Sequence, residues 1–431
     1  ATFSSDFRQK KFGFCPKGTA LCERKRVGEK SSREFESHRQ LGNEVVIYHP
    51  HNFFIMTMDR KFIKILVLII LIILLLLIGL KVYNNQKSDE WSLQISNKMF
   101  SGPRAKRVPI KNASLAAPAD PQANKDAADI LKYFYALSGN EVENLILSGQ
   151  NIGSASEILE SIGEGYEKYF KALEDQTGKL PVIMSIDYGW EKLPDDYTKI
   201  NKTLIDYWKK GGLISISVSP SNPFTGGGLY DFGMGGRKYD DLFREGAETH
   251  KRWISDLDKM AAGLKELQDA GMVVLWRPLH EMNGDWFWWS YGESGRTSKG
   301  EYAKLWKHMF DYFTKDKELH NLLWIYSPNA TLGYSEIKSV DYYYPGDEYV
   351  DIIGMDYYWN DMTKVNEDSS YDALVRLNKP VGFAEIGAQR KSGFNNPMII
   401  KAIDKKFPQM VFEIHWQGWT NLGFLHTQRG I

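Results

Sequence analysis

The sequence predicts an α/β fold, a single (β/α)8 TIM barrel that occupies residues 120–431. Short apolar runs alternate with segments of helical periodicity over this region, as they do in successive βα units. Two of the runs end in a glutamic acid, and two such acids converge only if both strands run the same way in one sheet. The eight expected strands begin near Asn144, Pro181, Leu213, Met272, Leu322, Tyr349, Pro380 and Met410.

The segments between the expected strands are amphipathic. The clearest are 248–270 and 298–319, where apolar residues recur every three or four positions. Eight strand and helix pairs match a closed barrel with its catalytic groups at the carboxyl ends of the strands. Residues 421–431 show no convincing eighth helix. We therefore expect the final helix to be missing or truncated and the barrel to be incompletely closed.

The most informative stretch follows the fourth expected strand. An apolar run leads to Glu281, and Trp-Phe-Trp-Trp follows at 286–289. A carboxyl group beside His and Trp loses hydration, which raises its pKa and suits a general acid. Flat aromatic rings can stack on the apolar faces of sugars. They could instead belong to the core, but the polar turn at 283–285 favours a surface cleft. The stretch therefore indicates a sugar-cleaving site.

A second acid is needed, because glycoside hydrolysis usually employs two carboxyl groups on opposite sides of the bond. Glu385 is the best candidate, since it ends the apolar run 380–384 as Glu281 ends its own strand. A zinc site is the other interpretation of His280-Glu281, but Gly284 stands where the metalloprotease pattern needs a second histidine. We predict no metal and no cofactor.

Further polar and aromatic candidates follow the sixth and eighth expected strands. Asp356, Tyr357 and Tyr358 end one, and Trp416 ends the other. Neighbouring residues of a strand face opposite sides, so one of the two tyrosines should point into the cleft. The Gly-rich segment 226–236 lacks the ending of a phosphate-binding loop. We interpret it as a long mobile loop beside the cleft, without a chemical role.

Three segments together resemble the glycoside hydrolase family 26 β-mannanases. They are Arg-Pro-Leu-His-Glu-Met-Asn-Gly at 277–284, the aromatic run 286–289, and Phe-Ala-Glu-Ile-Gly at 383–387. The resemblance runs from about residue 120 to 419. It implies a retaining endo-hydrolase of β-1,4-mannosidic bonds in mannan, glucomannan or galactomannan, with Glu281 as acid/base and Glu385 as nucleophile. It also implies substrate-binding roles for His280, Trp286, Asp356, Tyr358 and Trp416.

The chain departs from this family at the end of the third expected strand. Members often carry a histidine there, and Ser219 occupies the place. The rings and acids also do not identify the sugar. The same mechanism on another β-glycan, such as xylan or mixed-linkage glucan, is the alternative, and a carbohydrate-binding barrel without activity is a more remote one.

The front of the chain has a different character. Residues 1–57 are polar and without periodicity, so we expect a leader without a folded role. Within 58–83, a basic flank precedes an apolar run over 62–80 that only Lys64 interrupts. This pattern predicts a signal peptide or an uncleaved membrane anchor, and both place the catalytic part outside the cytoplasm, secreted or anchored. Residues 84–119 are rich in Ser, Asn, Pro and Ala, as in a linker.

The composition narrows the range of partners. The chain has 54 basic and 54 acidic residues, a formal net charge of zero. There is no Lys/Arg-rich stripe, so a nucleic-acid partner is not expected, whereas an uncharged plant-type mannan is compatible with neutrality. Both cysteines, Cys15 and Cys22, lie in the leader, so the barrel should depend on no disulfide. We expect a monomer.

Overall fold

We examined the protein as a computed structural model. It describes residues 64–65, 67–80, 107, 110, 117–139, 146–154, 166–290, 297–331, 337–358, 369–387, 402–403 and 405–416. The chain divides into two compact units, 1–82 and 83–431. The second unit contains the sheet.

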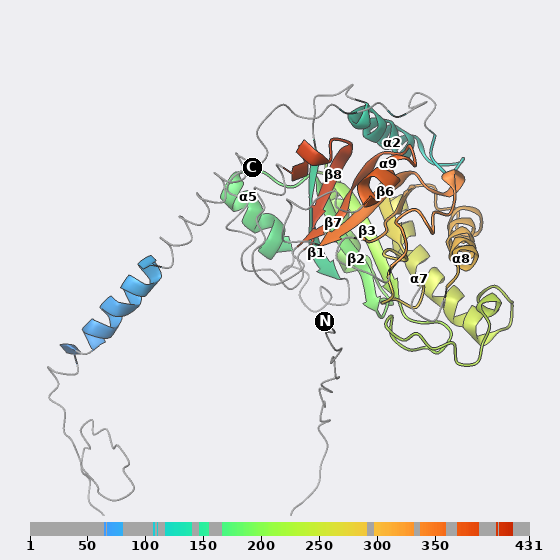
Figure 1. Ribbon diagram of the computed structural model, residues 1–431, viewed down its shortest axis with the longest axis horizontal. Helices are drawn as coiled ribbons and strands as arrows, with labels where there is room; N and C mark the ends of the chain where they lie inside the picture. Colours follow the sequence, from blue (N-terminus) through green and yellow to red (C-terminus); the bar gives the residue numbers. More distant parts are fainter. Residues whose placement is uncertain are drawn as a thin grey trace, which may run out of the picture. The chain divides into compact units, whose positions relative to one another are not determined.

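The sheet is a closed barrel of eight parallel strands in sequential order, the TIM barrel that the sequence predicts (Figure 1). The strands are β1 (Leu147–Ser154), β2 (Ile183–Glu191), β3 (Leu213–Pro220), β4 (Val274–Pro278), β5 (Leu322–Tyr326), β6 (Ile352–Tyr358), β7 (Val381–Gly387) and β8 (Met410–His415). The expected starts lie within a few residues of these, the farthest being Asn144 against Leu147 and Tyr349 against Ile352. The strand prediction is therefore confirmed.

The barrel closes between its first and last strands. β1 and β8 pair in parallel from Leu147 with Phe412 to Gln150 with His415. The expectation of an incompletely closed barrel is therefore wrong, because the pairing between these two strands closes the sheet. The helix expected to be missing would fall after residue 416, outside the described residues.

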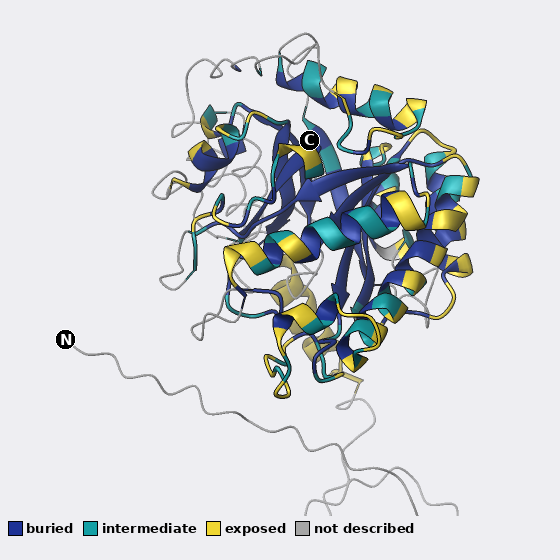
Figure 2. Cartoon of the chain, turned by 90° about the vertical axis from the view of Figure 1, so that its right-hand side faces the viewer, coloured by how far each residue is buried: buried dark blue, intermediate teal, exposed yellow. Residues whose placement is uncertain are grey.

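Helices surround the barrel, with their buried sides toward the strands and their exposed sides outward (Figure 2). The described helices are α2 (Lys125–Ser138), α5 (Ala172–Thr177), α6 (Thr198–Trp208), α7 (Glu248–Asp269), α8 (Lys299–Asp311) and α9 (Ser370–Val375). Short π-helical segments η2 (Tyr166–Lys171) and η4 (Tyr312–Asp316) and 3-10 turns η3 (Tyr239–Leu242) and η5 (Asp347–Tyr349) complete them. The predicted helices at 248–270 and 298–319 are confirmed, and the second begins with a capping box between Ser298 and Glu301.

Apolar residues form two cores. The outer core lies between the barrel and its helices and contains alternate residues of the strands, such as Met184, Ile186 and Tyr188 of β2. The inner core fills the barrel interior and includes apolar residues of α2, among them Phe134, which meets Phe412 edge to face at 5.8 Å. α2 therefore closes the N-terminal end of the barrel, and the opposite end is left for the site.

The expected linker 84–119 includes residues that belong to the barrel, and Arg107 is the clearest of those described. Arg107 is buried and donates hydrogen bonds to the backbone carbonyls of Leu137, Pro408 and Met410. It thus ties the end of α2 to the start of β8.

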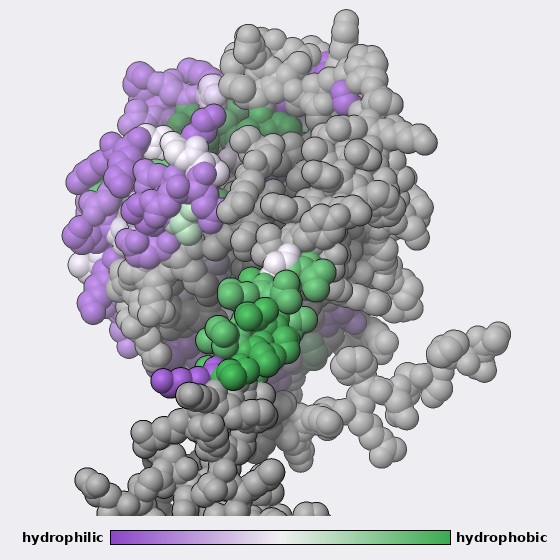
Figure 3. All heavy atoms as spheres, turned by 90° about the vertical axis from the view of Figure 1, so that its left-hand side faces the viewer, coloured by the Kyte–Doolittle hydropathy of each residue, from purple (hydrophilic) through white to green (hydrophobic). Residues whose placement is uncertain are grey.

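In the first unit, residues 67–80 form a helix whose large apolar side chains are exposed, as the green surface in Figure 3 shows. Among the described residues, no helix has the length and apolar character needed to cross a membrane. The rest of the expected signal peptide or anchor, and the leader 1–57, lie outside the described residues.

Candidate active site

A cavity of about 310 Å³ lies where the carboxyl ends of the strands meet. Side chains from β2, β6 and β7 and from the segments that follow β3, β4, β5 and β8 line it. They are Trp190, Tyr230, His280, Glu281, Trp286, Phe287, Asn329, Tyr358, Glu385 and Trp416. The structure thus brings both candidate glutamates, which are far apart in sequence, to one cavity.

Glu281 is held in the cavity by an unusual backbone conformation. Leu279 and Glu281 have φ values of 49° and 53°, in the left-handed region that residues with a side chain seldom adopt. The N–H of Glu281 donates to the carbonyl of Ser327 at 2.8 Å, which ties this turn to the end of β5. Nε1 of Trp286 donates to Oε2 of Glu281 at 2.6 Å.

Gly284 is required for the approach of Trp286. A Cβ atom at this position would lie 2.4 Å from the Trp286 ring, too close for any side chain. The glycine of the motif therefore allows the indole to fold back over the turn and reach Glu281.

A β-bulge aims Glu385 into the barrel. β6 and β7 pair Met355 with Phe383 but Asp356 with Glu385, so that one extra residue, Ala384, is inserted in β7. Phe383 and Ile386 pack in the outer core and Ala384 in the inner core. Without the bulge, alternation would turn Glu385 to the same side as Phe383, away from the cavity.

Arg277 of β4 spans the barrel interior and joins two carboxyl groups. Its Nη1 donates to Oδ2 of Asp356 at 2.9 Å, and its Nη2 donates to Oε1 of Glu385. The hydroxyl of Tyr358 donates to the other oxygen of Glu385. Because both oxygens of Glu385 accept hydrogen bonds, one of them from a cation, this carboxyl group is fixed in place beside a positive charge.

Glu281 is in the opposite electrostatic situation. Burial, and then the charge of Glu385, raise the pKa of Glu281 to about 8, although the Trp286 hydrogen bond acts against this shift. Burial also lowers the pKa of His280 well below its ordinary value, so this histidine is neutral. The raised pKa therefore suits Glu281 to the role of a proton donor near neutral pH.

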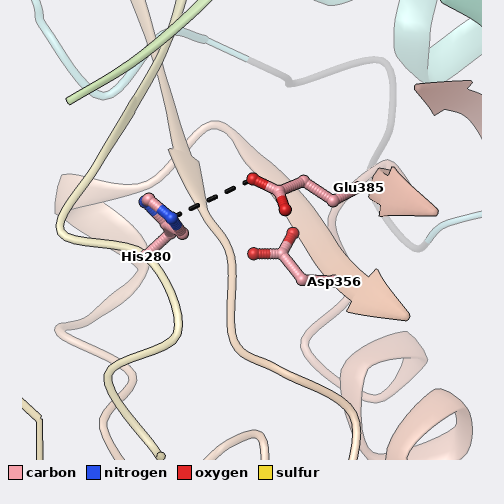
Figure 4. A group of neighbouring side chains, drawn as sticks. All are labelled: His280, Asp356 and Glu385. Carbon is pink, nitrogen blue, oxygen red and sulfur yellow. Dashed lines mark ion pairs between the residues drawn. The ribbon is translucent and has the colours of Figure 1, made fainter. Parts of the chain in front are cut away.

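His280, Asp356 and Glu385 form a compact group whose polar atoms lie within 4.8 Å of one another (Figure 4). Nε2 of His280 is 3.9 Å from Oε1 of Glu385. Such a group could in principle hold a cation. However, the guanidinium of Arg277 already pairs with both carboxylates, so we interpret the group as part of an ion-paired site.

The aromatic run divides between cavity and core. Trp286 and Phe287 line the cavity. Trp288 and Trp289 are buried, and their indole nitrogens donate to the carbonyls of Pro220 and His280. The first two aromatic residues of the run therefore belong to the cavity, and the last two belong to the core.

The remaining sequence candidates take distinct places. Tyr358 and Trp416 line the cavity, whereas Tyr357 is buried in the outer core. Asp356 is buried behind the cavity, where it accepts hydrogen bonds from Arg277 and from Oγ of Ser327 at 2.7 Å. Ser219, at the position where the family often has histidine, is buried in the barrel wall and does not line the cavity.

Sequence reasoning missed four residues of the site. Arg277 was part of the motif, and a lone charge within an apolar strand is the signal that could have identified it. Trp190 ends β2 and Asn329 follows β5, positions at which barrels collect functional groups. Tyr230 belongs to the Gly-rich loop, which therefore does contribute to the cavity.

This loop is held by its own hydrogen bonds. Nδ2 of Asn222 donates to the carbonyl of Gly233 at 2.9 Å, and Oγ1 of Thr225 donates to Asp231. The ring of Tyr230 lies 6.1 Å from that of Trp190 and 5.8 Å from that of Phe287. The loop thus completes an aromatic wall on one side of the cavity.

A neutral acid facing an ion-paired carboxylate across an aromatic cavity is the arrangement that cleavage of a glycosidic bond requires, and the barrel is accordingly that of a glycoside hydrolase. Comparison with known families agrees with the chemistry. The chain belongs to glycosyl hydrolase family 26, whose model matches residues 119–429.

Several family relatives are similar over most of the barrel. The mannan endo-1,4-beta-mannosidase A and B of Caldalkalibacillus mannanilyticus is 34% identical over 74% of this chain, a match that spans 61% of that protein. The mannan endo-1,4-beta-mannosidase of Bacillus subtilis is 35% identical over 71% of this chain and 83% of its own length. The solved structure of Bacillus subtilis mannanase man26 superimposes with a TM-score of 0.59 at 32% identity, covering 70% of this chain and 88% of that one.

Proposed function

We propose that the protein is a retaining endo-1,4-β-mannanase that acts on mannan, glucomannan or galactomannan. The observation that carries the proposal is the contrast between the two glutamates. Glu281 stays protonated because it is buried beside another acid, whereas Glu385 is paired with the cation of Arg277 and held by the hydroxyl of Tyr358. The names of the two relatives above support the choice of mannan as the polysaccharide.

In the first step, Glu281 protonates the glycosidic oxygen while a carboxylate oxygen of Glu385 attacks the anomeric carbon. The C–O bond to the leaving sugar breaks, and a glycosyl ester forms on Glu385. In the second step, Glu281 removes a proton from water, which attacks the same carbon and releases the sugar. Both acids return to their starting protonation states.

Other residues bind and orient the sugar. Trp286 and Trp416 line the cavity, where flat aromatic rings can stack on a sugar. His280, neutral and at the edge of the cavity, can hydrogen-bond a sugar hydroxyl without adding charge. Tyr358 orients the nucleophile directly, and Asp356 does so through Arg277.

Digestion of mannan by the wild type and the Glu385→Ala variant tests this proposal. The wild type should release oligosaccharides of several lengths, with the first products in the β configuration, and the variant should lose nearly all turnover. Glu348→Ala is the control, because Glu348 is an exposed carboxylate on η5 outside the cavity. Substantial residual turnover of Glu385→Ala would exclude this residue as nucleophile, and preferential cleavage of xylan or mixed-linkage glucan would contradict the substrate.

We also propose that the barrel works outside the cytoplasm as a monomer. The basic flank before the apolar run at 62–80 supports export, with the run either removed or kept as an anchor. Fractionation of cells that express the chain distinguishes these two fates, and activity confined to the cytoplasm would contradict both. Size-exclusion chromatography checks the monomer.

A further inference from the structure

A buried carboxyl group lies in the barrel wall next to the site. Asp187 of β2 has no exposed surface. Its Oδ1 accepts the N–H of Gly189 at 2.9 Å, and its Oδ2 accepts the hydroxyls of Ser217 and Ser219, each at 3.0 Å. Three donors thus hold this carboxyl group in one orientation inside the barrel.

Asp187 shares a register row with Arg277. Asp187 pairs with Ser217 across β2 and β3, and Ser217 pairs with Arg277 across β3 and β4. Residues in one row of parallel strands face the same side of the sheet. Asp187 and Arg277 therefore both face the interior, and Arg277 lowers the pKa of Asp187 through its charge.

Arg277 is shared by four carboxyl groups. Besides Asp187, its charge acts on Glu281, and it pairs directly with Asp356 and Glu385. The paired groups lie on β6 and β7, across the interior from β4, whereas Asp187 lies on the near wall. Arg277 thus has carboxyl groups on both sides of it, two of them in direct ion pairs and Asp187 within reach of its charge.

We propose that Asp187 is a positioning residue that acts through Arg277, and that its charge sets the upper end of the pH range in which the two catalytic glutamates function. No substrate contact is involved, because Asp187 does not line the cavity. The kinetic test of this proposal rests on the proposed function, because it measures turnover of mannan. The NMR titration of Glu281 does not depend on turnover.

The carboxyl group of Asp187 gains its negative charge at a pH close to neutral. Burial raises the pKa of Asp187 to about 6, against the opposing effects of its hydrogen bonds and of Arg277. Among the described residues, those that lie beside Asp187 on the two neighbouring strands are serines. They are Ser154 on β1, and Ser217 and Ser219 on β3. Tyr197 is the other titratable neighbour, and the charge of Asp187 contributes to its raised pKa.

This position predicts an asymmetric effect for Asp187→Asn. Above about pH 6 the variant lacks a negative charge that the wild type carries. The positive charge of Arg277 is then no longer partly offset by Asp187, so it stabilises the ionised forms of the other carboxyl groups more strongly. Glu281 should lose its proton at lower pH. The basic limb of the profile of kcat/KM should therefore move a few tenths of a pH unit downward, while the acidic limb moves little because Asp187 is already protonated there.

Asp351→Asn is the matched control. Asp351 is also buried with a pKa raised to about 6 by burial, and it accepts the N–H groups of Ala119 and Trp324, away from the cavity. Loss of its charge should change the melting temperature without moving the basic limb. The Glu281 carboxyl resonance in ¹³C NMR gives the same titration without substrate, so a wrong substrate assignment would leave this measurement intact.

A basic limb of Asp187→Asn that coincides with the wild type would overturn the proposal, as would an equal shift in Asp351→Asn. If Asp187→Asn does not fold, Ser219→Ala takes its place. This variant removes one donor to the anion, so the Asp187 charge should appear at higher pH and the limb should shift in the same direction by less. An unchanged Glu281 titration in that variant would equally refute the idea.

Discussion

The hydrogen bond between Trp286 and Glu281 offers a direct test of how the acid is tuned. Trp286→Phe keeps an aromatic ring in the cavity and removes the N–H that donates to Oε2 of Glu281 at 2.6 Å. This hydrogen bond favours the ionised carboxylate. A hydrogen bond to a charged group contributes about 1 kcal/mol more than one to its neutral form, and about 1.4 kcal/mol corresponds to one pKa unit. The pKa of Glu281 should therefore rise by roughly 0.7 units above its value of about 8.

The assay is the pH dependence of kcat/KM on a soluble manno-oligosaccharide. A higher pKa keeps the acid protonated to higher pH, so the basic limb should move upward in Trp286→Phe. Trp288→Phe is the matched control, since its indole donates to the carbonyl of Pro220 and its ring lies outside the cavity. A basic limb that stays in place in the first variant, or that moves as far in the control, would refute the assignment of this limb to Glu281.

Three further changes probe separate parts of the structure. Arg277→Lys keeps the positive charge but loses the planar guanidinium that binds Asp356 and Glu385 together. Steady-state kinetics should show kcat lowered roughly 10-fold to 100-fold, the equivalent of one charged hydrogen bond. An unchanged kcat would count against this role of the guanidinium. Tyr230→Ala removes a half-exposed ring from the aromatic wall, so KM for the polysaccharide should rise about fivefold with little change in kcat. A decrease confined to kcat would argue against a role of Tyr230 in binding. Phe134→Ala leaves a cavity where α2 closes the barrel. Denaturant unfolding should show that the free energy of unfolding falls by about 3–5 kcal/mol, and a fall of less than 1 kcal/mol would mean that α2 is only loosely attached.

Local patterns were sufficient to predict the strands and the two candidate glutamates. Each strand of a buried parallel sheet is a short apolar run, which the chain shows eight times. Residues at the carboxyl ends of such strands must gather at one end of the barrel, so the sequence was sufficient to predict that Glu281 and Glu385 lie together. The motif at 277–284 contributed the family resemblance.

Other features depend on contacts between distant strands, and no local pattern encodes them. Simple alternation along β7 would have turned Glu385 outward, and only pairing with β6 reveals the bulge at Ala384 that turns it inward. Closure was misjudged because it depends on hydrogen bonds between β1 and β8, not on a terminal helix.

The sequence by itself determined the order of the strands, the barrel they form, and the acids that end two of them, because apolar periodicity and strand ends are local properties. Tertiary structure alone decided which groups surround these acids. Glu281 and Glu385 differ because one is buried beside a like charge and the other accepts hydrogen bonds from Arg277 and Tyr358. Desolvation and charge pairing depend on which groups meet in space, and here those groups come from strands on opposite sides of the barrel.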